Sequence, residues 1–140
     1  MRKSLPLIIA GALMLTAGPV AAKSNAAAHK AEARIAKITA GRSAAAPVDC
    51  IFLNQINSSE IVAGTAIVYR MNDGTIYVNR PDSGATFLDR DDILVTDTHS
   101  PQLCDVDVVR LVDSSSRMNR GSVGLGKFVP YPRVRQSASR

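Results

Sequence analysis

The 140-residue chain has no tryptophan, two cysteines, two histidines, three tyrosines and three phenylalanines. Single-stranded nucleic acid is bound on aromatic side chains set among basic ones, and no such interleaving occurs here, so we expect no nucleic-acid binding. The cysteines form no Cys-x-x-Cys motif, which argues against a thiol redox site. A zinc site is also not expected, because a disulfide would use both cysteines and His99 alone cannot hold the metal.

The N-terminus has the three-part layout of a secretory signal peptide. Arg2 and Lys3 precede an apolar run over residues 5–17, and Val20 and Ala22 supply small residues before a cleavage site. We therefore predict a signal peptide over 1–22, a mature chain from Lys23, and a periplasmic or secreted location. A retained anchor is the alternative, but the run is short for the roughly 20 apolar residues that span a bilayer. No transmembrane segment is expected in the mature chain.

Export to an oxidising compartment makes a disulfide between Cys50 and Cys104 the favoured state of the two cysteines. Such a bridge closes a loop of about 55 residues, for which chain entropy gives on the order of 4 kcal/mol at most. Two free thiols are the alternative.

Charge changes sign along the mature chain. Residues 23–46 carry five basic side chains against one acidic, residues 47–113 carry eleven acidic against four basic, and residues 114–140 carry six basic and no acidic. Basic flanks thus enclose an acidic domain. Three roles stay open for the flanks: folding back on the domain, contacting anionic envelope polymer or lipid, or keeping the chain soluble, which is the simplest.

The flanks and the domain differ in amino-acid composition. Residues 23–46 are basic and alanine-rich, with Ser24 or Asn25 as an N-cap and Gly41 as a stop for a short helix. A linker is preferred, because Ile35 and Ile38 are the only large apolar residues on the helical face. We assign 47–132 to a small β domain with a flexible connection at 114–120, and 133–140 to a basic disordered tail.

A hairpin across Asn72-Asp73-Gly74 is the clearest element, with arms at 65–71 and 75–80. A two-residue Asp73-Gly74 turn would set Arg70 opposite Tyr77 and sort one apolar face from one mixed face. A preceding strand at 56–62 completes a three-stranded antiparallel meander. A fourth strand is expected over 103–112, and residues 121–132 either add a last strand or dock on the meander. The predicted fold is mainly β, a small antiparallel meander with one disulfide.

No catalytic residue, metal site or cofactor is assigned. The glycines of 121–126 predict turns rather than a phosphate loop, and Asp89-Arg90-Asp91-Asp92 lacks the glycine and glutamate of a calcium loop. Asp97, His99 and Ser100 are too close in sequence for a catalytic relay. Asp105 and Asp107 are interpreted as a solvated strand face.

The mixed face of the hairpin is the preferred binding surface, because arginine and tyrosine are favoured at interfaces. Its residues are Val68, Arg70, Tyr77 and Asn79. Packing of Arg70 and Tyr77 within the domain is the alternative.

The segments Cys50-Ile51-x-Leu53, 67–74, Tyr77-Val78-Asn79-Arg80 and Leu103-Cys104-x-x-Asp107 resemble an uncharacterised family of small secreted bacterial proteins. The resemblance implies no known activity. It does imply two further cysteines, one after the Asn-Arg strand and one just before the Leu-Gly-x-Phe segment. At these two places this chain has residues 82–84 and 122–124, which contain no cysteine. The resemblance therefore implies that one of two disulfides has been lost.

Together these features predict a noncatalytic, envelope-associated binding or interaction domain. Its partner would be an envelope protein or an anionic envelope polymer. The alternative is a small periplasmic hydrolase or a cation-dependent enzyme that uses clustered carboxylates.

Overall fold

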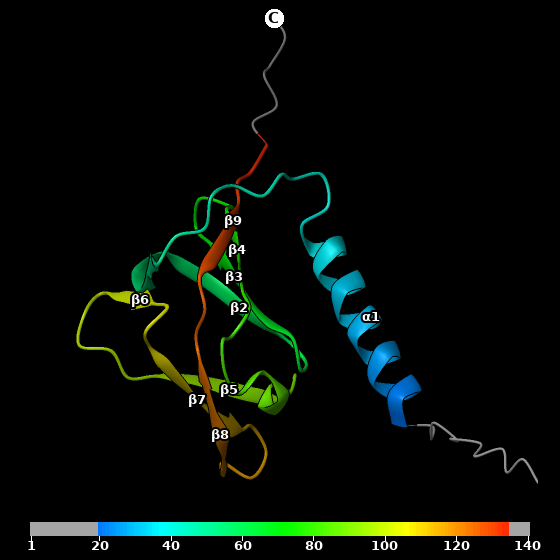
Figure 1. The fold of residues 1–140 in the computed structure, drawn as a ribbon. Helices are drawn as coiled ribbons and strands as arrows, with labels where there is room; N and C mark the ends of the chain where they lie inside the picture. The colour runs from blue at the N-terminus through cyan, green and yellow to red at the C-terminus, as the bar shows by residue number, and fades with distance from the viewer. Residues whose placement is uncertain (1–19, 135–140) are drawn as a thin grey trace, which may run out of the picture.

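The computed structural model describes residues 20–134 (Figure 1). In this range the chain forms the helix α1 (Val20–Ile38) and nine strands. The strands are β1 (Cys50–Phe52), β2 (Ile56–Val62), β3 (Ala66–Met71), β4 (Ile76–Asn79), β5 (Asp92–Thr96), β6 (Gln102–Cys104), β7 (Val108–Asp113), β8 (Asn119–Gly124) and β9 (Phe128–Tyr131). All strand pairs are antiparallel, in sheets of order β1-β6, β2-β3-β4-β9 and β5-β7-β8. The predicted mainly β fold and its β2-β3-β4 meander are confirmed.

The predicted disulfide is also confirmed. Cys50 lies opposite Cys104 in the β1-β6 pair, and their sulfur atoms are 2.05 Å apart. The neighbouring residues, Ile51 and Leu103, are buried in the main core. The bridge therefore fixes two core residues that lie far apart in sequence.

The four-stranded sheet is buried on both faces. One face packs under α1, through Ala31 and Ile35 of the helix. The other face packs against β6, β7 and β8 and contains Ile67, Tyr69 and Phe128. The ring centroids of Tyr69 and Phe128 are 5.9 Å apart. Figure 1 shows α1 to one side of β2, β3, β4 and β9, which places the sheet in the middle layer.

The predicted hairpin register is wrong. Met71 bonds Thr75 across a turn of three residues, 72–74, so Arg70 faces Ile76 and Tyr69 faces Tyr77. Gly74 has φ of 84° and donates its N–H to the Met71 carbonyl at 3.0 Å, an arrangement typical of a turn followed by a glycine bulge. The prediction failed because it required one apolar and one mixed face, whereas both faces of β3 are covered.

Of the two interpretations of residues 23–46, a linker or a short helix, the structure has a helix as far as Ile38. The helix is already formed at Val20, so Ser24 and Asn25 lie inside it and do not cap it. It ends at Ile38, before Gly41 as predicted. The small side chain of Ala31 lets the helix lie close to the sheet, where a larger side chain would hold it away. Ile35 fills the space between the helix and the sheet.

The predicted fourth strand over 103–112 is two strands in different sheets, β6 and β7. Asp107 causes the break, because its Oδ2 accepts the Cys104 N–H at 2.7 Å while its own N–H bonds the Cys104 carbonyl at 3.0 Å. Asp105 and Asp107 thus lie in a turn, not on a solvated strand face.

The C-terminal segment is part of the sheets. The glycine-rich residues predicted as turns form most of β8, and residues 119 and 120 of the predicted flexible connection begin that strand. Val123, Leu125 and Phe128 are buried, and β9 pairs with β4 as one of the two predicted outcomes.

Most of the predicted signal peptide and of the predicted tail lie outside residues 20–134. Between Val20 and Val134, no helix is both long enough and apolar enough to cross a bilayer.

Candidate binding groove

The structure separates the residues predicted to form one binding face. Arg70 shares the α1-facing side of β3 with Val68 and donates to Glu60 Oε2 at 2.8 Å. Tyr77 and Asn79 point to the opposite side, where Tyr77 packs against the main core. Asn79 is fully buried and exchanges hydrogen bonds with the backbone of Gly126, at 2.5 and 3.2 Å. Arg70 and Tyr77 therefore do not stack, and the binding role of these residues remains a prediction.

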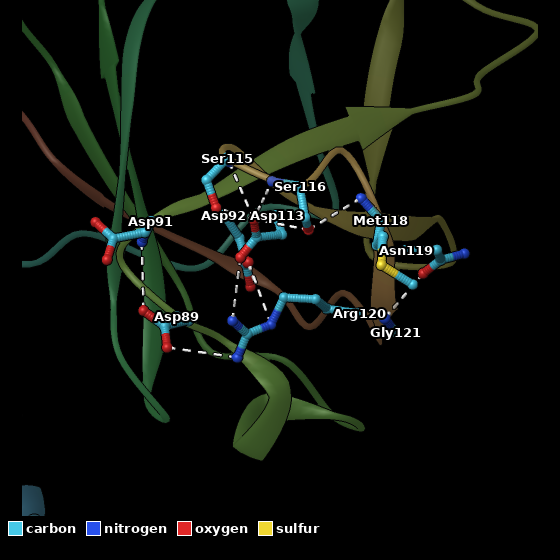
Figure 2. Close-up of polar contacts among 10 residues, drawn as sticks. All are labelled: Asp89, Asp91, Asp92, Asp113, Ser115, Ser116, Met118, Asn119, Arg120 and Gly121. Atoms are coloured by element: carbon cyan, nitrogen blue, oxygen red, sulfur yellow. Dashed lines mark hydrogen bonds and ion pairs between the residues drawn. The ribbon is translucent and has the colours of Figure 1, made fainter.

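The acidic residues near β5 form a clamp around Arg120 (Figure 2). The guanidinium lies 3.5 Å from carboxylate oxygens of Asp89, Asp92 and Asp113, which joins β8 to β5 and β7. Hydrogen bonds from Ser115 and Ser116 hold the pKa of Asp113 well below its usual range. The Asp92 side chain is fully buried, and neither of its oxygens accepts a hydrogen bond, so Arg120 supplies its main compensating charge.

The carboxylates of Asp49, Asp105 and Asp107 also have structural partners. Lys127 pairs with both Asp49 and Asp105, and Asp107 caps the turn after β6. Within residues 20–134, no three His, Cys, Asp or Glu side chains converge so as to hold a metal ion. Asp49, Asp105 and Asp107 are thus engaged in holding the fold.

One edge of the four-stranded sheet is covered and the other is open. Beside β9, Val48 and Phe128 exchange hydrogen bonds of 2.9 Å, and Ala45 donates to the Pro130 carbonyl at 2.8 Å. On the side away from β3, the opposite edge strand, β2, makes no comparable bonds over residues 58–61 with any part of the described chain. Backbone groups of β2 are thus available for pairing.

The direction of the available groups follows from the hairpin. Met71 donates to the Thr75 carbonyl at 2.9 Å, so the odd-numbered residues of β3 bond β4 and the even-numbered residues bond β2. Their partners on β2 are Ser58, Glu60 and Val62. Ser59 and Ile61 therefore point their N–H and C=O groups away from the sheet.

Two adjoining pockets follow this open edge. The first, of about 410 Å³, lies between α1 and β2, and the second, of about 470 Å³, lies between β2 and β5. Because Glu60, Ile61 and Arg90 line both, we describe them as one edge groove. Its other lining residues are Ala27, Lys30, Ala31, Arg34, Ser59, Val62, Ala63, Asp92, Ile93 and Leu94.

The edge groove has an excess of positive charge. Glu60 accepts from Arg34 at 2.7 Å and from Arg70 at 2.8 Å, and these arginines lower the pKa of its carboxyl, Arg34 having the larger effect. Lys30 and Arg90 are exposed and form no ion pair with any described residue. Two uncompensated cations thus border an open strand edge.

Sequence reasoning missed this groove. Lys30, Ser59 and Arg90 are far apart in sequence, and only the order of the strands shows that β2 and β5 both lie at sheet edges. A weak signal was present, since β2 contains neither lysine nor proline, the residues that commonly protect an edge.

Comparison of the chain with protein-family models, curated proteins and solved structures finds no match.

Proposed function

We propose that this protein is a noncatalytic, exported binding protein of the cell envelope, and that an anionic ligand binds in its edge groove. The observation that carries the proposal is the pair of cations without acidic partners, Lys30 and Arg90, beside an open sheet edge. Charges on a concave surface that are opposite in sign to those of the ligand speed its encounter with the protein and favour it over other ligands.

Two features support an exported location. The first 22 residues have the composition of a signal peptide, and the Cys50–Cys104 disulfide is of a kind that persists in oxidising compartments. Cleavage after Ala22 would retain Ala31 and Ile35, the helix residues that pack on the sheet.

The proposal is tested by reversing the groove charge in the mature chain from Lys23. The probes are an acidic peptide, vesicles containing anionic phospholipid, and a sulfated polysaccharide, each titrated at low and high salt. Lys30→Glu with Arg90→Glu is expected to abolish binding of the ligand class that the groove accepts.

The matched control is Arg110→Glu with Arg117→Glu, which changes the net charge equally at two exposed positions outside the groove. This control should bind like the unchanged chain. Equal losses in both variants would mean that net charge, not the groove, determines binding, and would overturn the proposal.

A further inference from the structure

We infer that the ligand of the edge groove is an extended acidic peptide that adds as a strand to β2. The inference rests on the proposed function, because it names the class of ligand that the same groove takes. Peptides recognised in this way gain affinity from main-chain hydrogen bonds and specificity from alternate side chains.

The backbone of β2 is suited to such pairing. The strand runs from Ile56 to Val62, and its only irregularity lies between Ile56 and Ser58, which leaves residues 58–62 in regular register with β3. Within this stretch Ser59 and Ile61 direct their N–H and C=O groups into the groove, two residues apart. That spacing is the one at which an added strand places its own matching groups.

The side chains of the groove select the peptide. Lys30 and Arg90 favour carboxylates, while Ile93 and Leu94 provide apolar surface. Successive side chains of a strand point to opposite faces. A segment in which acidic and apolar residues alternate can therefore satisfy both kinds of contact.

A second copy of the chain fits less well. Pairing of β2 with β2 across a two-fold axis would bring two sets of the same uncompensated cations together, and like charges facing each other disfavour association. Neither an anionic lipid surface nor a polysaccharide would use the outward N–H and C=O pattern of β2.

The probe is a capped peptide of alternating glutamate and valine, titrated into the isotope-labelled mature chain. We expect shifts and slowed amide exchange at Ser59 and Ile61. Because the Ser59 N–H is not used by the native sheet, Ser59→Pro removes one donor at an edge position where proline is tolerated. This variant should weaken binding about fivefold to tenfold, the loss expected for about one hydrogen bond, whereas Ser59→Ala should bind normally.

A second measurement does not depend on the folding of Ser59→Pro. Two versions of the same peptide, each N-methylated at one of the two alternating sets of amides, keep the charge but lose the main-chain donors of one edge, and the version methylated on the edge that faces β2 should not bind. Binding of both versions as tightly as the unmethylated peptide would overturn strand addition and leave the proposed function intact. Charge-dependent binding of vesicles or polysaccharide, without binding of the peptide, would also overturn strand addition and leave the proposed function intact.

Two other outcomes are distinct. In the first, the chain associates with itself, Ser59→Pro abolishes this association, and the peptide does not bind. The occupant of the β2 edge would then be a second copy of the chain and not a peptide. Failure of every probe to bind in the groove would overturn the proposed function as well as this inference.

Discussion

At the scale of single residues, Asn79 connects two parts of the chain that contribute neighbouring strands. Its side chain donates to the Gly126 carbonyl at 2.5 Å and accepts the Gly126 N–H at 3.2 Å, with no exposed surface. A Cβ on Gly126 would lie 2.3 Å from the Arg80 carbonyl, so the backbone of residue 126 is held against the end of β4. The amide is therefore a structural group that positions β9.

We predict that Asn79→Ala lowers the free energy of unfolding by about 2–4 kcal/mol. Two hydrogen bonds are lost, and the N–H and C=O of Gly126 remain buried without a partner. Urea denaturation of both proteins measures the difference. Asn57→Ala is the control, because Asn57 is exposed and its amide contact with Asn72 spans 3.5 Å. A loss for Asn79→Ala no larger than that of the control would contradict this role.

At the scale of elements, the sequence predicted what local chemistry determines. The end of β2 and the region of the β3-β4 turn follow from turn residues, Ala63-Gly64 and Asp73-Gly74. The register of the hairpin did not follow, because it depends on α1 covering the second face of the sheet. The edge groove could not be predicted either, since it arises from the order of strands in two sheets.

The helix α1 is held on the sheet by a small apolar contact and by two ion pairs. Arg34 donates to Glu60 at 2.7 Å, and Glu32 accepts from Arg80 at 2.7 Å. Exposed pairs of this kind each contribute little. Because the apolar contact is small as well, the docking of the helix is sensitive to loss of these charges.

We predict that α1 detaches in acid before the sheets unfold. Arg80 lowers the pKa of Glu32, and Arg34, with Arg70, lowers the pKa of Glu60, each from an ordinary value of 4.5. A lowered pKa in the folded state means that the stabilisation is fully present above about pH 4.5 and is lost as the pH falls through the lower folded value. Hydrogen-exchange protection should therefore fall first at Ala31 and Ile35 and later in β3.

The matched variant is Glu32→Gln with Glu60→Gln. It should show weak protection of α1 at neutral pH and little further change on acidification. A helix that stays protected in acid as long as β3 does would contradict the predicted order of unfolding.

At the scale of the whole molecule, one contact between two distant segments is held by hydrogen bonds alone, without a disulfide. The segment before η2 (Ala85–Phe87) lies against the end of β8, where Asp82 donates to the Gly124 carbonyl at 3.0 Å and Gly124 donates to the Ser83 carbonyl at 3.1 Å. These are the two regions at which the family resemblance implies a second pair of cysteines. Their contact in the fold is consistent with a bridge between them, although the resemblance itself remains a prediction.

We predict that Ser83→Cys with Gly124→Cys forms a second disulfide and stabilises the protein. A Cβ on Gly124 would lie 3.9 Å from the Ser83 Cβ, within the range that disulfides adopt, and 2.6 Å from the Ser83 Oγ, the position that the bridging sulfur would take. Gly124 does not have a positive φ, so cysteine meets no backbone strain there. The new bridge would close a loop of about 40 residues, for which chain entropy gives on the order of 4 kcal/mol at most.

Intact mass without reductant should show the loss of four hydrogens in the variant and of two in the unchanged chain. The variant's midpoint of thermal unfolding should rise, and reductant should lower it. Gly124→Cys alone is the control: its side chain would contact the Ser83 hydroxyl without a bond to form, so it should destabilise the fold. Free thiols in the double variant under oxidising conditions would show that 83 and 124 are not held together as the structure places them.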